Sequence, residues 1–208
     1  MSYQQYRPLS PFELPLITKN LLLINVLLFV FTTYIIKPIN LHHYLDLYYF
    51  TLPGFKPHQF ITHMFMHADL RHLFFNMLGL YMFGSLLESV WGSKRFINFY
   101  LLCGIFAALS QLLFCYVSGQ PAILLGASGA VSGLLGATGV LFPNREVYLY
   151  FFPVKVKYLV PFFFAVSWYS GYQSLTGDNT AHFAHVGGLV AGIIIVLIWN
   201  KTNRNTLY

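Results

Sequence analysis

Two residues of the sequence could form a nucleophile and its base. Ser128 lies in the segment LLGASGA, and His185 is followed at helical spacing by Gly188 and Gly192. A histidine that accepts the proton of a serine hydroxyl turns a weak nucleophile into an effective one. Each residue also has a simpler explanation. Small residues around a serine allow close packing of membrane helices, and a lone histidine can bond a polar neighbour or a metal.

The two residues occupy equivalent positions in their segments. Ser128 lies 14 residues before Phe142. His185 lies 14 residues before Trp199, and each of these later residues marks the end of an apolar run. At 1.5 Å per residue, the serine and the histidine both lie about 21 Å from that end. Glycines in both segments would let the two helices pack backbone to backbone, so the sequence predicts that the hydroxyl lies within reach of the imidazole.

The sequence also contains hydrogen-bond donors that could stabilise the oxyanion formed when the serine attacks a carbonyl. His72 and Asn76 are four residues apart, so on a helix they share one face. Gly126 and Ala127 precede Ser128, and a helix that begins near the serine leaves its first backbone N–H groups without helical partners. Such donors stabilise the oxygen of a tetrahedral intermediate. The alternative for His72 and Asn76 is a hydrogen-bonded link between helices.

The composition is that of a membrane protein. Of 208 residues, 57% are apolar and 9% are charged, against about a quarter charged in soluble proteins. These values exclude a disordered chain and an ordinary water-soluble domain. Twelve basic residues exceed six acidic ones, but they are scattered between apolar runs, so we expect no nucleic-acid partner. Cys103 and Cys115 lie in one apolar run and indicate packing, not a disulfide or metal framework.

The apolar runs predict an all-α fold, a polytopic bundle of six transmembrane helices. Residues 1–15 would form a short N-terminal segment, 16–199 the membrane domain and 200–208 a tail. The first run lacks a small-residue cleavage site, so we expect an anchor and not a removed signal peptide. The aromatic connection 37–71 is expected in the bilayer interface. The expected spans are residues 16–36, 72–90, 96–117, 122–141, 156–172 and 182–199.

The basic residues predict the orientation of the bundle in a cell membrane. With both termini cytoplasmic, nine of the twelve basic residues fall on the inner side, as the positive-inside rule requires. Ser128 and His185 then lie toward the outer side. At the inner side, Glu88 is expected to brace the loops with Lys94 or Arg95. The nine inner basic residues are Arg7, Lys19, Lys94, Arg95, Arg145, Lys155, Lys157, Lys201 and Arg204.

Taken together, these motifs resemble the rhomboid family of intramembrane serine proteases. The resemblance covers residues 61–199 and is carried by four features. They are the GASG motif around Ser128, the HxxxN motif from His72 to Asn76, the glycines after His185, and the order of the elements. The combination is specific, although each motif alone is common.

The resemblance implies a mechanism and a substrate class. Ser128 would be the nucleophile and His185 the general base of a dyad without a third acid. His72, Asn76 and backbone N–H groups near the serine would form the oxyanion hole, with no cofactor and no metal. Substrates would be single-span membrane proteins that enter sideways, between the second and fifth spans, and are cut near the outer boundary. The oligomeric state is left open.

The sequence departs from the family pattern at two places, one beside the catalytic histidine and one in the first loop. Many relatives carry a tyrosine four residues after the serine, stacked on the catalytic histidine, and this position is Ser132 here. The stacking support for His185 must therefore come from elsewhere. A Trp-Arg pair often found in the first loop is absent, because that loop contains no tryptophan. Neither departure removes a chemical group from the dyad.

Three other functions are compatible with parts of the sequence. An inactive rhomboid-like protein that binds membrane clients would not need both Ser128 and His185. A channel without chemistry does not explain their equal depths. A metal site or metal transporter lacks the His-Glu-x-x-His motif and has only Asp69 as a nearby carboxylate. Its ligands would come from His63, His67, His72, His182 and His185.

Overall fold

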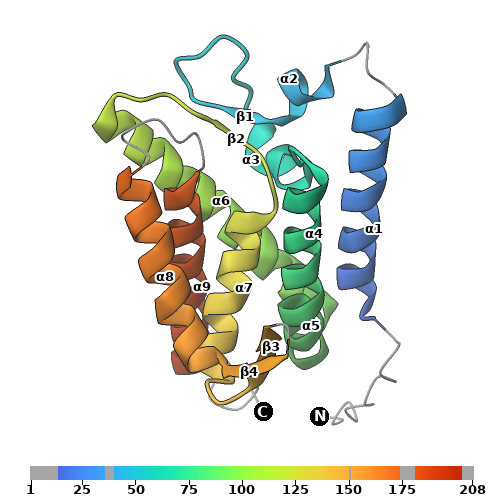
Figure 1. Cartoon of the computed structure of the whole chain (residues 1–208), viewed down its shortest axis with the longest axis vertical. Coiled ribbons are helices and arrows are strands. Elements are labelled where there is room, and N and C mark those ends of the chain that lie inside the picture. Colours follow the sequence, from blue (N-terminus) through green and yellow to red (C-terminus); the bar gives the residue numbers. More distant parts are fainter. Residues whose placement is uncertain (1–13, 36–39, 150, 174–180, 203–208) are drawn as a thin grey trace.

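The chain folds into a bundle of helices with two small pairs of strands (Figure 1). The computed structural model describes residues 14–35, 40–149, 151–173 and 181–202. The expected terminal segments lie mostly outside these residues, so their boundaries stay predictions. The long helices are α1 (Leu16–Val30, extended by a π-helical turn Phe31–Ile35), α4 (Leu70–Gly79, continued by a π-helical turn Leu80–Gly84), α5 (Ser85–Trp91), α6 (Ser93–Ser118), α7 (Ser128–Leu141), α8 (Val156–Gln173) and α9 (His182–Thr202).

Four helical stretches of the described chain are long and apolar enough to cross a membrane: Leu16–Ile35, Leu70–Trp91, Ser93–Ser118 and His182–Thr202. Helix α7 is apolar but has only 14 residues. Helix α8 has 18 residues and contains Pro161. The predicted all-α membrane bundle is confirmed, whereas the number of six spans stays a prediction.

The fourth predicted span begins later than expected. We predicted a helix over 122–141, but α7 starts at Ser128, and the segment before it is extended. The reason is a strand pair, because β2 (Ile123–Leu124) pairs antiparallel with β1 (Leu47–Tyr48). Gly126 then turns the chain with a φ of 111°, a conformation that glycine adopts without strain. The predicted start at residue 122 is therefore wrong.

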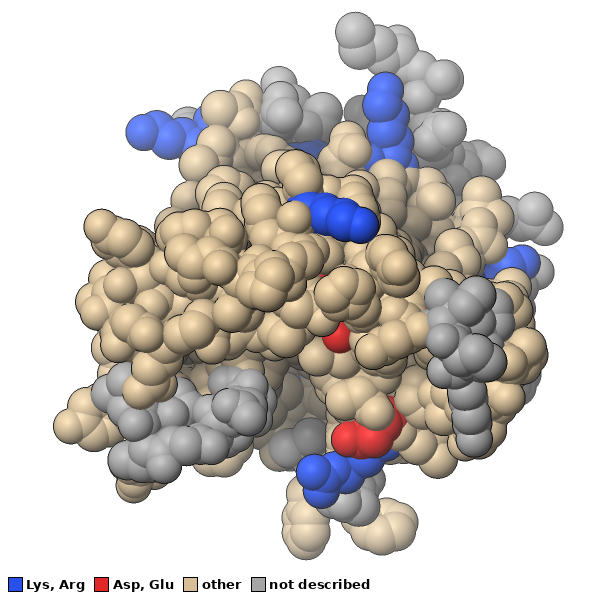
Figure 2. Space-filling model, turned by 90° about the horizontal axis from the view of Figure 1, so that it is seen from above, with Lys and Arg blue, Asp and Glu red and all other residues tan. Residues whose placement is uncertain are grey.

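The long connection after α1 forms a compact cap on one end of the bundle. It contains α2 (Leu41–Leu45), α3 (Gln59–Thr62) and the 3₁₀ turn His63–Phe65. In Figure 1 this cap lies at the end where α7 begins. Seen from that end, charged side chains are scattered among uncharged ones (Figure 2). The location of the cap in the bilayer interface stays a prediction.

Helix α7 runs through the middle of the bundle and touches α9 through glycines (Figure 1). A Cβ atom on Gly188 would overlap the carbonyl oxygen of Gly129, and one on Gly192 would overlap that of Gly133. On another face of α7, a Cβ on Gly129 would lie 2.5 Å from the Cβ of Ala107 in α6. The predicted backbone-to-backbone packing of these two glycine-rich helices is confirmed.

Glu88, buried near the end of α5, holds the start of α1. Its carboxylate accepts hydrogen bonds from the N–H groups of Ile17 (2.9 Å) and Thr18 (2.7 Å). The hydroxyls of Thr18 (2.8 Å) and Ser93 (2.6 Å) also donate to it. A carboxylate at a helix N-terminus satisfies N–H groups that lack helical partners and interacts favourably with the helix dipole. Glu88 therefore links α1 to the start of α6.

The expected partners of Glu88 are wrong. We predicted a brace with Lys94 or Arg95, but the oxygens of Glu88 are used by α1 and Ser93. The Arg95 guanidinium instead lies over the Trp199 ring, 4.1 Å from its centroid. The sequence did not reveal these contacts, because α1 lies 70 residues away along the chain.

Replacing Glu88 should loosen α1. In Glu88→Ala, buried donors at the start of α1 lose their acceptor, which costs about 1–3 kcal/mol per unsatisfied group. We expect the melting temperature in detergent to fall by roughly 2–10 °C. Glu146→Ala, at an exposed position in β3 (Glu146–Leu149), is the matched control and should melt like the wild type. Equal melting temperatures for the two variants would contradict the role of Glu88.

Candidate active site

Ser128 and His185 are hydrogen-bonded to each other. The Oγ atom of Ser128 lies 2.8 Å from the Nε2 atom of His185. Ser128 is the first residue of α7, and His185 lies in the first turn of α9. Because the glycines just beyond them hold the two helices in contact, the two helix starts lie side by side. The distance is that of a nucleophile and a general base.

The start of α7 leaves backbone donors beside the serine. The first helical bond of α7 runs from the N–H of Val131 to the carbonyl of Ala127 (2.9 Å). The N–H groups of residues 128–130 therefore have no carbonyl partner within the helix. They lie at the positive end of the helix dipole, where a negative oxygen is stabilised. A helix that began at residue 122 would have used these donors.

Gly126 leaves room for His72 and Asn76. A Cβ atom on Gly126 would lie 2.6 Å from the His72 ring and 3.7 Å from the Nδ2 atom of Asn76. The N–H of Gly126 donates to the carbonyl oxygen of His63 (2.8 Å). Gly126 thus contributes space and not a donor. Its neighbour Ala127 is fully buried and accepts the first helical bond.

His72 and Asn76 lie on the same side of α4, as their spacing predicts. Asp69 caps this helix by accepting the N–H of His72 (2.8 Å). The Asn76 amide donates one hydrogen to the His72 carbonyl (3.0 Å). An amide nitrogen carries two hydrogens, so the second can serve a ligand next to Gly126. The structure thus brings His72, Asn76 and Gly126 together beside Ser128.

The ring next to His185 comes from α8. Phe163 lies with its ring centroid 6.0 Å from that of His185, and His182 packs edge-on at 6.1 Å. Ser132, which stands where many relatives carry tyrosine, is buried and donates its hydroxyl to the Ser128 carbonyl (2.7 Å). Phe163 therefore takes the place of a tyrosine from α7 as the aromatic neighbour of the imidazole.

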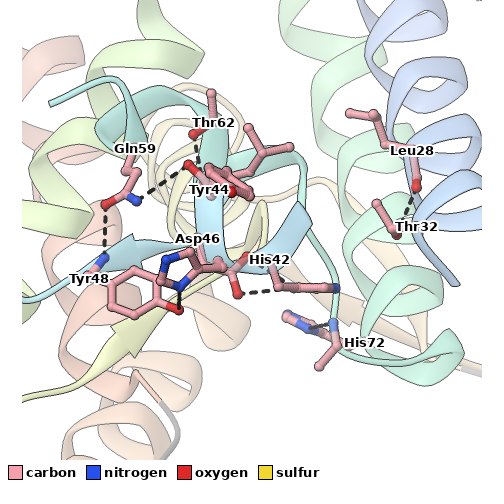
Figure 3. Close-up of polar contacts among 12 residues, drawn as sticks. Leu28, Thr32, His42, Tyr44, Asp46, Tyr48, Gln59, Thr62 and His72 are labelled. Atoms are coloured by element: carbon pink, nitrogen blue, oxygen red, sulfur yellow. Dashed lines mark hydrogen bonds and ion pairs between the residues drawn. The ribbon is translucent and has the colours of Figure 1, made fainter. Parts of the chain in front are cut away.

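The cap over the site is fastened by polar bonds. The buried Gln59 amide accepts the N–H of Tyr48 (3.3 Å) and donates to the Tyr44 carbonyl (3.4 Å) (Figure 3). The His42 ring bonds Asp46 at 3.0 Å (Figure 3), and this hydrogen bond raises the pKa of His42. These bonds hold the cap that carries β1, and β1 in turn pairs with the segment before Ser128.

Two further histidines of the cap are neutral packing groups. The His63 ring bonds the Gln59 carbonyl at 2.8 Å. The His67 ring packs edge-on against His72, with centroids 5.1 Å apart. Burial lowers the pKa of His63 and of His67 to about 4. At neutral pH both rings are therefore uncharged.

Gln111 of α6 is a residue that our sequence analysis missed. Its Oε1 atom accepts the N–H of Ala184 (3.2 Å), one residue before His185. Ala184 lies in the first turn of α9, and its N–H also bonds the Ala181 carbonyl (3.1 Å), so Gln111 supplies a second acceptor at this helix start. Gln111 is buried and thus anchors the start of the helix that carries His185. An amide side chain inside an apolar span was the signal that could have identified it.

A cavity of about 740 Å³ opens in front of the serine and histidine. Asp69, His72 and Asn76 line it on the α4 side, and it reaches past Ser128 as far as Val147 of β3. Most of its remaining wall is apolar, with side chains from α4, α7 and α8. The other lining residues include Phe75, Leu78, Met82, Phe83, Val131, Leu135, Leu159 and Phe163. The cavity thus combines an extended apolar surface with polar groups at the dyad.

The sequence over residues 55–201 matches the Rhomboid domain. This chain belongs to the rhomboid family. It is 33% identical over 132 residues to "Rhomboid protein 1, mitochondrial" of Saccharomyces cerevisiae, covering 62% of this chain and 38% of the relative. It is 32% identical over 137 residues to "Rhomboid protease GluP" of Bacillus subtilis, and the match covers 64% of this chain and 24% of the relative. It is 30% identical over 150 residues to "Rhomboid protease GlpG" of Serratia proteamaculans, and the match covers 70% of this chain and 49% of the relative.

These relatives support an intramembrane protease family for this rhomboid. Two of the three are named as proteases. The aligned part is less than half the length of each relative. The family and the membrane-bundle fold are therefore established, whereas the activity of this chain and its substrates are proposals.

The ligand set of the metal alternative is not assembled in this rhomboid. Within the described residues, no group of three or more His, Cys, Asp or Glu side chains is placed to hold a metal ion. His63 is bonded to Gln59, and His185 is bonded to Ser128. Cys103 and Cys115 are free buried thiols in α6, consistent with packing.

The Gln111 anchor can be tested by stability. Gln111→Ala removes one of the two acceptors of the Ala184 N–H, which also bonds the Ala181 carbonyl (3.1 Å). The loss of this hydrogen bond costs about 0.5–1.5 kcal/mol, so the melting temperature in detergent should fall by roughly 1–6 °C. Gln120→Ala, at an exposed position after α6, should leave the melting temperature unchanged. If Gln111→Ala melts with the control, Gln111 does not hold α9.

Proposed function

We propose that this rhomboid is an intramembrane serine endopeptidase that uses Ser128 and His185 as a catalytic dyad. The observation that carries the proposal is the 2.8 Å contact between Oγ and Nε2, which faces a cavity among apolar helices. Membership of a family with relatives named as proteases supports the same function. No cofactor and no metal enter the proposed reaction.

The reaction begins with proton transfer inside the dyad. The Ser128 hydroxyl gives its proton to the Nε2 atom of His185, and its Oγ atom bonds the carbonyl carbon of the scissile peptide. The carbonyl oxygen becomes an oxyanion, which the N–H groups at the start of α7 and the side chains of Asn76 and His72 can stabilise. Protonated His185 then gives its proton to the leaving nitrogen as the C–N bond breaks.

A water molecule completes the cycle. His185 accepts a proton from the water, whose oxygen attacks the carbonyl carbon of the acyl–serine ester. Collapse of the second tetrahedral intermediate releases the carboxyl product, and the proton returns to Ser128. Phe163 and His182 flank the imidazole on which both proton transfers depend.

The proposed substrates are single-span membrane proteins. A helical peptide bond has its carbonyl engaged within the helix, so the substrate must unwind before Ser128 can attack. The cavity is lined by Phe75 of α4 and Phe163 of α8, which belong to the second and fifth helices of the expected bundle. A substrate that enters between these helices would unwind next to the polar groups of the site.

The proposed topology follows from the charges and the site. We infer six spans, both termini in the cytoplasm, and a site toward the outer side of a cell membrane. The distribution of basic residues supports this orientation. In Figure 1, the start of α7 lies at the opposite end of the bundle from the start of α1. The oligomeric state is not part of the proposal.

Four single variants separate the roles of the site residues. We expect Ser128→Ala and His185→Ala to abolish cleavage of a single-span substrate, because the nucleophile or its base is lost. Asn76→Ala should retain activity reduced by about 10²–10³, the cost of one oxyanion donor. His182→Ala should be reduced far less, because the ring that bonds the Ser128 hydroxyl is His185, and His182 packs against that ring. The measurement is the initial cleavage rate of purified protein in detergent.

Two controls complete this test. A fluorophosphonate should label the wild type but not Ser128→Ala. Chelation with EDTA should leave the cleavage rate unchanged. Loss of activity in EDTA with recovery in Zn²⁺ would favour the metal alternative. Substrate binding without cleavage by folded wild-type protein would favour the inactive client-binding alternative.

Side entry predicts different effects on large and small reactants. Phe75 is 58% exposed and lines the cavity, so Phe75→Ala should widen the entrance and raise the cleavage rate of a membrane substrate several-fold. Labelling by a small fluorophosphonate should not change, because this reagent does not need the wide entrance. The control is Phe74→Ala, which is 57% exposed but does not line the cavity. Equal rates for both variants would count against entry beside α4.

A further inference from the structure

The hairpin between α7 and α8 lies at the opposite end of the bundle from the start of α7 (Figure 1), the helix whose first residue is Ser128. Strands β3 (Glu146–Leu149) and β4 (Phe152–Lys155) pair antiparallel. Their ends are tied to the neighbouring chain by two backbone bonds. The N–H of Val156 donates to the Arg145 carbonyl (2.9 Å), and that of Lys157 donates to the Pro143 carbonyl (2.9 Å). The two strands of the hairpin are thus tied to the ends of α7 and α8.

The two faces of the hairpin differ in what they contact. Val147 is 6% exposed and forms the far end of the active-site cavity. Tyr148, the next residue, points to the other face and is 66% exposed, because successive side chains of a strand alternate. At the turn, Phe151 is 90% exposed and Phe152 is 75% exposed. Three aromatic rings therefore project from a short hairpin with little protein around them.

Basic side chains surround these rings. Arg145, Lys155 and Lys157 are all exposed at the base of the hairpin. Glu146 is the acidic residue of this segment, and it lies across from Lys155 in the strand pair. Arg145 and Lys157 therefore remain as positive charges without a cross-strand carboxylate. The hairpin combines aromatic rings at its tip with net positive charge at its base.

We propose that this hairpin binds anionic phospholipid headgroups at the membrane boundary opposite Ser128. Aromatic rings are favoured at the level of the headgroups, and basic residues at that level attract anionic lipids. The hairpin joins the ends of two bundle helices, so its rings and charges meet the bilayer at this depth. A soluble protein partner would have to compete with lipid for rings that adjoin the membrane. The proposal does not depend on protease activity.

The test uses a fluorescent reporter at the tip of the hairpin. Phe151→Trp is placed in nanodiscs of phosphatidylcholine that contain a minority of either brominated phosphatidylglycerol or brominated phosphatidylcholine. The measurement is the quenching of the emission that this tryptophan adds to that of the wild type. We expect brominated phosphatidylglycerol to quench at least about twofold more strongly, because lipid with a negative headgroup gathers at the basic side chains.

Matched charge variants show whether the hairpin itself selects the lipid. Adding Lys155→Gln and Lys157→Gln to the reporter should remove the difference between the two lipids. Adding Lys94→Gln and Lys201→Gln, two exposed lysines outside the hairpin, should preserve it. Arg145→Gln probes the same surface with a single change if the double variant loses its fold.

Three outcomes would overturn the proposal. Equal quenching by the two lipids in the reporter protein would show that the hairpin does not select anionic headgroups. An absence of quenching by either lipid would place the tip outside the membrane and favour a protein partner. Equal loss of selectivity in both pairs of lysine variants would assign the effect to the overall charge. None of these outcomes bears on whether Ser128 cleaves a substrate.

Discussion

The close approach of α7 and α9 is the constraint on which the site depends. Gly188 and Gly192 lie against the carbonyls of Gly129 and Gly133, where a Cβ atom would not fit. Gly129 follows the serine directly, so this contact sets the distance between the hydroxyl and the imidazole. In lipid, helices gain little from burying apolar surface, and close packing of this kind is a main source of their association. The same contact thus supports both the fold and the alignment of the dyad.

A second constraint fixes where α7 begins. Helix propensity alone would have allowed an earlier start, since the preceding residues are apolar. The pairing of β2 with β1 and the turn at Gly126 keep the chain out of the helix until Ala127, directly before the serine. The unpaired N–H groups of the first turn therefore lie beside Ser128. For this reason the cap formed by the first connection contributes to the proposed chemistry, although its side chains in α2 and α3 do not line the cavity.

The parts of the site that follow from local spacing could be predicted from the sequence. Equal distances from the helix ends predicted that Ser128 meets His185, and the four-residue spacing predicted a shared face for His72 and Asn76. The sequence did not reveal contacts between distant segments, such as those from Glu88 to α1 and from Gln111 to Ala184. Such contacts depend on which helices become neighbours, and periodicity does not encode that choice.

The site differs from the rest of the bundle in how its backbone N–H groups are hydrogen-bonded. A polar group buried in a membrane protein is costly unless it is hydrogen-bonded. Glu88 accepts from N–H groups at the start of α1, and Gln111 accepts from the N–H of Ala184 at the start of α9. Thr138 donates to a carbonyl of its own helix. At the start of α7, by contrast, the protein places a cavity beside Ser128. In the proposed reaction, a substrate carbonyl that enters this cavity meets donors that α7 itself does not use, and its oxygen bonds them more strongly as it becomes negative. The other helix starts are stabilised by side chains that accept from their N–H groups, whereas the start of α7 keeps free the donors that the proposed catalysis requires.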